Sequence, residues 1–68
     1  MMDEKFRKCT FNIFWSEEDQ EWVGTCDQFK GLSYLDKSIH DAASGIFTLV
    51  ESVIEDMTAN GEPMPWTV

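Results

Sequence analysis

The spacing of apolar residues changes once along this 68-residue chain, and that change limits the folds open to it. Between residues 9 and 35 apolar and polar side chains alternate over short stretches, which is typical of half-buried strands. After Ser38 apolar residues recur every three or four positions, as on one face of an amphipathic helix. The sequence therefore predicts strands followed by one helix, an α+β arrangement.

Three strands are predicted before the helix. Residues 9–15 (CTFNIFW) and 22–27 (WVGTCD) are joined by a polar, acid-rich turn, and residues 32–35 follow a second turn. Short polar connections between strands indicate antiparallel hairpins. In the first hairpin, Cys9 lies either opposite Cys26 or two residues away from that position. We expect the first strand to place four side chains on one face of the sheet: Cys9, Phe11, Ile13 and Trp15.

A helix is predicted from Ser38 to the Asn60-Gly61 pair. Ser38 and Asp41 have the S-x-x-[DE] spacing of a capping box, in which each side chain accepts a backbone N–H at the helix start. Gly61 suits the left-handed position that ends many helices. Gly45 and several β-branched residues lower the helix propensity, so this helix is expected to depend on packing against the sheet.

The simplest arrangement of these elements is one three-stranded antiparallel sheet with the long helix on one face, in the order β-β-β-α. Residues 1–68 then form a single domain, with a flexible N-terminus at 1–8 and a proline-containing extended tail at 61–68. The tail has room for a short fourth strand at residues 66–68.

The face of the sheet away from the helix is left open, and the alternation places Phe14 on it. An aromatic side chain there is either a lone exposed residue or part of a contact patch. A chain of this length buries only about 60% of its unfolded surface, so it usually needs a staple, a metal or a partner subunit. We therefore expect a homo-oligomer, a dimer or higher, with Phe14 and the tail residue Trp66 as candidates for self-association.

The chain is acidic, with a formal net charge of −8 from thirteen acidic and five basic residues. This charge repels nucleic-acid phosphates and anionic membranes and attracts basic surfaces. It forms either an ordinary solvated surface or a surface that meets a basic partner. For the second case we predict contacts by acids of the first turn and of the helix: Glu17, Glu18 and Asp19, and Asp41, Glu51 and Glu55.

The residue types that carry chemistry do not form a recognisable catalytic pattern. Cys9, Cys26 and His40 are either a metal or nucleophilic site, or two small core residues and a histidine at the rim. The sequence offers no C-x-x-C motif and no evident fourth ligand, which favours the second interpretation. We therefore predict no enzyme activity, no metal site and no cofactor.

The three tryptophans are expected to pack in the core or at an interface and not to stack on bases: Trp15, Trp22 and Trp66.

Residues 1–8 (MMDEKFRK) are charged and lack the apolar stretch of a signal peptide. No run of residues approaches the length of a membrane span. We expect a cytoplasmic protein without membrane contacts, in which both cysteines are reduced.

Four runs of residues combine into a family pattern: FNIFWSEEDQEWV at 11–23, DQFKG at 27–31, SIHDA at 38–42 and NGEPMP at 60–65. Together they resemble the N-terminal domain of HicB-like antitoxins. In that family the corresponding runs are an alternating strand with an acidic turn and an aromatic-valine strand, a D-L-P-G turn, a T-x-E-E-A helix start and a D-G-E-P-I-P exit. Lys30 stands where the family has proline, and Asp36-Lys37 stands where it has Gly-Asp.

The resemblance implies a partial ribonuclease-H-like fold without nuclease activity. Domains of this family bind and mask a small basic toxin, a ribonuclease, and they self-associate. Complete antitoxins of the family also carry a DNA-binding segment, which the sequence to Val68 does not show, so direct nucleic-acid binding is not expected. The expected function is that of an antitoxin-like protein-binding domain. The alternative is a stand-alone oligomeric module without a toxin.

Overall fold

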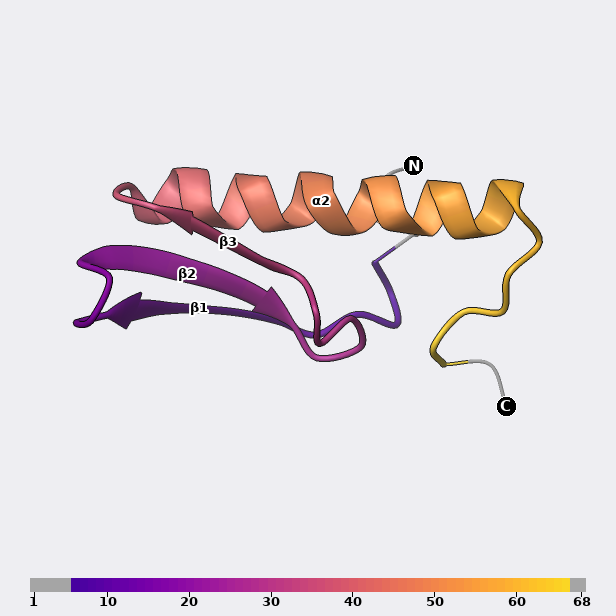
Figure 1. Ribbon diagram of the computed structural model, residues 1–68, viewed down its shortest axis with the longest axis horizontal. Helices are drawn as coiled ribbons and strands as arrows, with labels where there is room; N and C mark the ends of the chain where they lie inside the picture. The colour runs from indigo at the N-terminus through magenta and orange to yellow at the C-terminus, as the bar shows by residue number, and fades with distance from the viewer. Residues whose placement is uncertain (1–5, 67–68) are drawn as a thin grey trace.

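The computed structural model describes residues 6–66, which form three strands and one helix (Figure 1). The strands β1, β2 and β3 make one antiparallel sheet in the order β1-β2-β3, and helix α2 lies along one face of it. The predicted α+β class and β-β-β-α order are confirmed. The elements span β1 Phe11–Ser16, β2 Glu21–Cys26, β3 Ser33–Asp36 and α2 Ile39–Ala59.

The strand bounds differ from the predicted ones by one or two residues. Gln20 has a φ of 54°, and this left-handed residue reverses the chain quickly enough for Ser16 to pair with Glu21. The first hairpin therefore extends one residue further into its turn than predicted. At the other end, Cys9 lies outside β1, because the Thr10 N–H donates to the Gln28 side-chain oxygen (2.7 Å) and the backbone pairing with β2 ends there. The Cys9 N–H donates to the Phe6 carbonyl oxygen (2.9 Å). The third strand begins and ends one residue later than predicted.

Ser38 caps α2, and its side-chain oxygen accepts a hydrogen bond from the Asp41 N–H (3.3 Å). The second half of the predicted capping box is wrong. The Ser38 N–H donates to Asp36 Oδ1 (3.0 Å) in place of the Asp41 carboxylate. The Asp41 side chain is one methylene shorter than the glutamate that usually closes a capping box, and Asp36 reaches the same N–H from two residues away.

Helix α2 ends at the predicted Asn60-Gly61 pair. Gly61 has a φ of 71°, the left-handed conformation that glycine adopts without steric cost. The Glu62 N–H donates to the Met57 carbonyl oxygen (2.8 Å), and the Gly61 N–H donates to that of Thr58 (3.2 Å). These two bonds form a Schellman motif and satisfy carbonyl groups that the helix leaves without partners.

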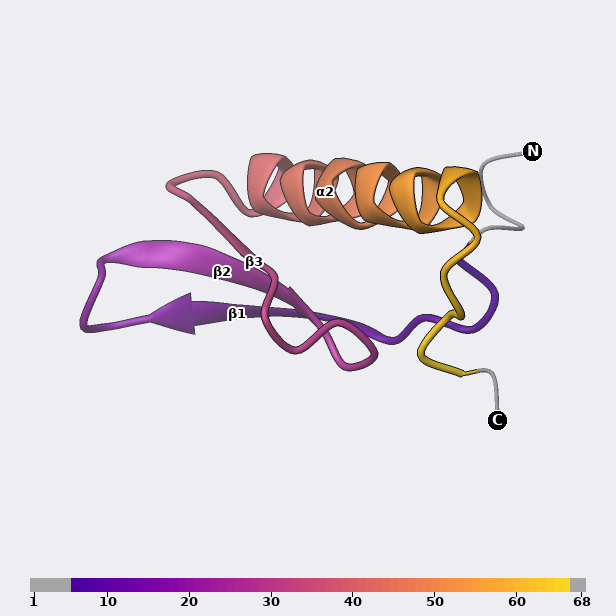
Figure 2. The ribbon, with the colours of Figure 1, turned by 45° about the vertical axis from the view of Figure 1, so that its right-hand side comes forward.

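The core lies between α2 and the sheet (Figure 2). Gly24 on the central strand marks a close approach of strand and helix, since a Cβ atom there would lie 2.8 Å from Ile46 Cγ2 and 2.9 Å from the Ala42 carbonyl oxygen. The cross-strand partners of Gly24, which are Ile13 and Tyr34, therefore share the helix-facing side. The helix contributes its buried residues at four-residue spacing: Ala42, Ile46, Val50 and Ile54.

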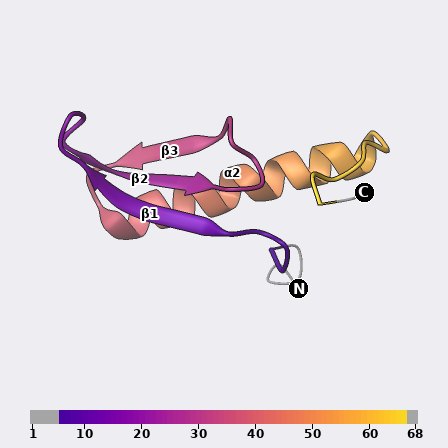
Figure 3. The same ribbon diagram turned by 90° about the horizontal axis from the view of Figure 1, so that it is seen from below.

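The helix is not centred on the sheet. It packs against β2 and β3 and touches β1 least; Figure 3 shows the three strands from the face away from α2. Near the start of β1 an aromatic cluster fills the remaining space, with ring centroids 4.8 Å apart for Phe11 and Phe47 and 5.2 Å apart for Phe6 and Phe11. Further along β1, Trp15 meets Trp22 of β2 edge-on, with ring centroids 5.5 Å apart, and remains exposed on its other side.

The ends of the described chain pack against the core. Phe6 belongs to the segment expected to be flexible, yet it is half-buried in the aromatic cluster. Trp66 lies in a turn and meets Phe29 edge-on, with ring centroids 6.1 Å apart. The remainder of the flexible segment, residues 1–5, and of the predicted fourth strand, residues 67–68, lies outside the described residues.

Replacing Gly24 with alanine tests the contact between the layers. The added methyl group overlaps the helix backbone at Ala42, so Gly24→Ala is expected to lower the free energy of unfolding by about 1–3 kcal/mol. The control is Gly31→Ala, because a Cβ at Gly31 meets no atom within 4 Å and should change that energy by less than about 0.5 kcal/mol. Urea unfolding of both variants measures the difference, and equal stabilities would contradict the assigned contact.

Candidate functional site

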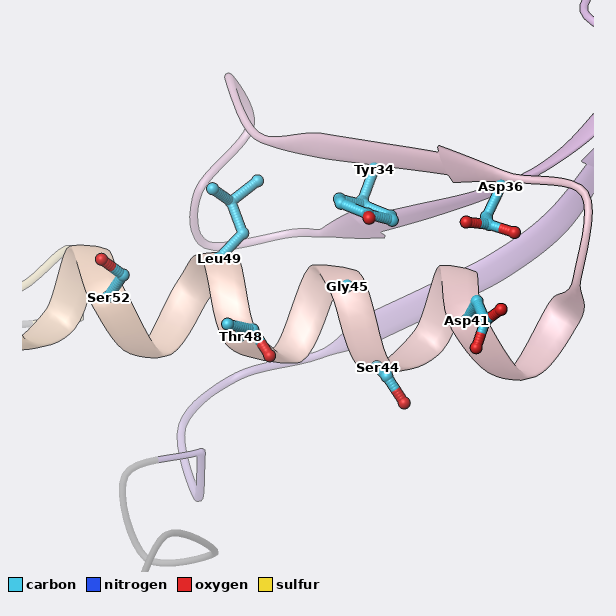
Figure 4. Close-up of a pocket in the computed structure, with 8 residues that line it drawn as sticks. All are labelled: Tyr34, Asp36, Asp41, Ser44, Gly45, Thr48, Leu49 and Ser52. Carbon is cyan, nitrogen blue, oxygen red and sulfur yellow. The ribbon is translucent and has the colours of Figure 1, made fainter.

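A groove of about 630 Å³ runs between β3 and α2 (Figure 4). Its volume falls in the range of ligand-binding pockets in proteins. The side chains along it are carboxylates, hydroxyl groups, one aromatic ring and one leucine, and none of these lining residues is basic. The groove is lined by Tyr34, Asp36, Asp41, Ser44, Gly45, Thr48, Leu49 and Ser52.

Gly45 and Tyr34 shape the middle of this groove. A Cβ atom at Gly45 would overlap the Tyr34 ring, so the ring lies directly on the helix where glycine leaves space. Figure 4 shows Tyr34 above Gly45 in this position. Sequence reasoning treated Gly45 only as a weak helix former and assigned no role to Tyr34. A glycine within an otherwise regular helix was the available signal, because it often marks a close approach.

Two carboxylates lie together at the end of the groove where β3 leads into α2. Asp36 is the last residue of β3 and Asp41 lies in the first turn of α2, and Figure 4 shows their side chains next to each other. Asp36 is held in place by the Ser38 N–H. Asp41 belongs to the predicted contact set, whereas Asp36 does not. Carboxylate and hydroxyl oxygens here can accept hydrogen bonds from a lysine, an arginine or a peptide N–H.

The other predicted helix acids lie further along α2. Glu55 follows Asp41 by fourteen residues, a rise of about 21 Å along the axis, and on a helical projection it continues the face that carries Ser44 and Thr48. Glu51 lies one turn before Glu55, about 40° further from the groove on the same projection. Of the three predicted helix acids, only Asp41 lines the groove, and the three do not form one compact cluster.

The β1–β2 turn is at the same end of the molecule as the first turn of α2, which contains Asp41 (Figure 1). The acids of the β1–β2 turn are exposed, but two of them also stabilise the turn. The Trp15 indole Nε1–H donates to Glu17 Oε2, and the Ser16 hydroxyl donates to Asp19 Oδ2 (3.1 Å). Glu18 is exposed at the centre of this turn.

An apolar row crosses the open face of the sheet. Phe14, Val23 and Leu35 are partners across the three strands, so they lie on one face, opposite to that of Gly24. Phe14 is 48% exposed and Leu35 is 38% exposed, and they flank the buried Val23. The predicted open position of Phe14 agrees with this register. The sequence did not indicate that Leu35 lies on this face. Its position depends on the register in which β3 pairs with β2, which alternation along the chain does not specify. Trp66, the other predicted self-association residue, is half-buried beside Phe29.

The two thiols are neighbours and form a side-chain hydrogen bond. Phe11 pairs with Cys26, so Cys9 lies two residues from the position opposite Cys26, which is the second of the two predicted registers. Burial raises the pKa of the Cys9 thiol from 9.0 to about 11, and the charge and a hydrogen bond of Cys26 add to this rise.

His40, the third residue considered as a metal ligand, is exposed on α2. Within residues 6–66 no three histidine, cysteine, aspartate or glutamate side chains form a possible metal site.

No family model, no curated protein and no solved structure matches the chain. Among the described residues, no helix combines the length and the apolar character that crossing a bilayer requires.

The raised pKa of Cys9 predicts that the protein loses stability in alkaline solution. Below pH 9 the thiol is protonated in both states; between about pH 9 and 11 it ionises only in the unfolded chain, which favours unfolding. Urea unfolding of the wild type and of Cys9→Ala, each measured across this range, isolates the effect. The wild type is expected to lose more stability than the variant, and identical pH dependences would contradict the assignment.

Proposed function

We propose that this chain is an antitoxin-like protein-binding domain, which neutralises a small basic protein by covering its active surface. The partner class is a toxin-like ribonuclease. The protein itself has no enzymatic role in this proposal, uses no cofactor and works in the cytoplasm.

The observation that carries the proposal is the acidic groove between β3 and α2. It offers carboxylates and hydroxyl groups without a basic residue, so a cationic segment of a partner finds acceptors along its whole length. From Asp41 to Ser52, the first and last helix residues that line the groove, the helix rises about 16 Å, which corresponds to about five residues of an extended chain. A lysine or arginine of that segment would lie between Asp36 and Asp41.

The overall charge supports the same partner class. The net charge of −8 steers a basic protein toward this chain and speeds its encounter. The exposed acids of the β1–β2 turn extend the contact beyond the end of the groove. The resemblance of four sequence runs to HicB-like antitoxins adds the expectation that such a basic partner is a ribonuclease toxin, and it extends the proposal to a partial ribonuclease-H-like fold.

A second candidate function is that of a stand-alone oligomeric module without a toxin. The exposed row formed by Phe14 and Leu35 favours it, because apolar side chains on an uncovered sheet face gain from contact with another protein surface.

Co-expression tests the leading proposal. A small basic protein encoded beside this gene is a consequence of the proposal; when produced alone it is expected to arrest growth, and co-expression of this chain is expected to restore growth. The two proteins should then co-purify, and the complex should weaken as salt is raised, because the contacts are ionic. A neighbouring protein that neither arrests growth nor co-purifies contradicts the proposal.

Removing charge from the groove tests where that partner binds. Asp41→Asn with Glu55→Gln removes one charge that lines the groove and one just beyond its end, and is expected to raise the Kd for the basic partner about tenfold, at up to ~1 kcal/mol for each exposed ion pair. Asp27→Asn with Glu62→Gln removes the same charge elsewhere and should change the Kd about twofold or less. Calorimetry at one fixed salt concentration compares the pairs, and equal effects would place the contact outside the groove.

A further inference from the structure

The outer edge of β1 presents a row of backbone groups that the sheet leaves without partners. The Asp27 N–H donates to the Thr10 carbonyl oxygen (3.0 Å), and in an antiparallel pair this bonding alternates along the strand. The even-numbered residues of β1 are therefore bonded to β2. The N–H and C=O groups of Phe11, Ile13 and Trp15 point away from the sheet, and within residues 6–66 no strand pairs with them (Figure 3).

This edge lacks the features that keep edge strands apart. Charged residues, prolines and bulges normally block the pairing of one edge with another. Residues 9–16 contain neither a charge nor a proline, and β1 pairs with β2 over its full length without a bulge. The other edge of the sheet, β3, is only four residues long and ends at Asp36-Lys37. Of the two edges, β1 is the one suited to a further strand.

Exposed apolar side chains lie on the same flank of the molecule. Phe47 contacts Phe11 and so faces the β1 side of the helix. Phe47 is 36% exposed, and Trp15 on β1 is 40% exposed. The off-centre position of α2 leaves these side chains without cover. A strand added beside β1 would extend the sheet over this flank of the helix.

We propose that β1 is a self-association surface, on which β1 of a second copy pairs antiparallel about a twofold axis and joins the two sheets into one. The favoured register places Ile13 opposite Ile13 of the second copy. Phe11 then lies opposite Trp15 of the second copy, and Trp15 opposite its Phe11. Each of these pairs exchanges two backbone hydrogen bonds, and this register uses all the outward-pointing groups of β1.

The net charge of the chain and the twofold symmetry of the pairing favour a second copy of this chain as the partner of β1. Two copies with a net charge of −8 repel each other, which favours contact through a surface without acidic side chains, and β1 is such a surface. A basic partner, in contrast, gains no ionic contact from an uncharged edge. The twofold axis also forms the aromatic pair of Phe11 with Trp15 twice, and each cross-strand pair of this kind contributes up to ~1 kcal/mol. This pairing does not depend on the proposed basic partner.

Amide hydrogen exchange tests the pairing directly in the wild-type protein. At a concentration where sedimentation shows a dimer, the amides of Phe11, Ile13 and Trp15 are expected to be protected, and dilution to the monomer should remove that protection. The amides of Asn12 and Phe14 are bonded to β2 and serve as internal controls that stay protected at both concentrations. Unprotected odd-numbered amides in a dimer would overturn the proposal, and so would a monomer at every concentration.

A matched pair of lysine variants separates this edge from the open face. Trp15→Lys places a charge on the edge and removes both aromatic pairs, so it should raise the dimer Kd at least about tenfold. Leu35→Lys puts the same charge at a similarly exposed position on the open face and should change that Kd about twofold or less. Loss of the dimer in Leu35→Lys alone overturns the proposal. Circular dichroism checks that both variants fold. If one of them does not fold, the hydrogen-exchange experiment on the wild-type protein decides whether β1 is the interface.

Discussion

The close contact between Gly24 and the helix is the constraint on which the rest of this structure depends. Only a residue without a Cβ lets the Ala42 carbonyl oxygen and the Ile46 side chain approach the central strand this closely. That contact fixes the separation of the two layers and holds the buried helix residues over β2. A chain of 68 residues has few core side chains, so the position of one glycine determines how they meet.

A second glycine accounts for the off-centre position of the helix on the sheet. Gly45 accepts the Tyr34 ring, which draws the helix toward β3 and away from β1. On the β3 side the result is a groove with carboxylates and hydroxyl groups along its walls. On the β1 side the result is an uncharged strand edge beside exposed apolar side chains. Both proposed binding surfaces thus follow from the lateral position of one helix.

The two surfaces differ in charge, and this difference separates the partners proposed for them. The acidic groove attracts a basic protein and repels a copy of this chain, whereas the β1 edge has no charge to distinguish them and offers backbone pairing. The surfaces are on opposite flanks of α2, so one partner does not block the other. A dimer formed through β1 would present two acidic grooves, which suits the binding of two basic partners.

The sequence by itself determined the order of the elements, the Ser38 cap, the Gly61 stop and the side of the sheet on which Phe14 lies. These features depend on local periodicity and on residues a few positions apart, so they can be read along the chain. The tertiary structure alone decided that Cys9 is offset from Cys26, that Leu35 joins Phe14, and that Tyr34 packs on Gly45 to form the groove. These contacts join residues distant in the chain, and they depend on strand register and on the lateral position of the helix, which no local pattern specifies.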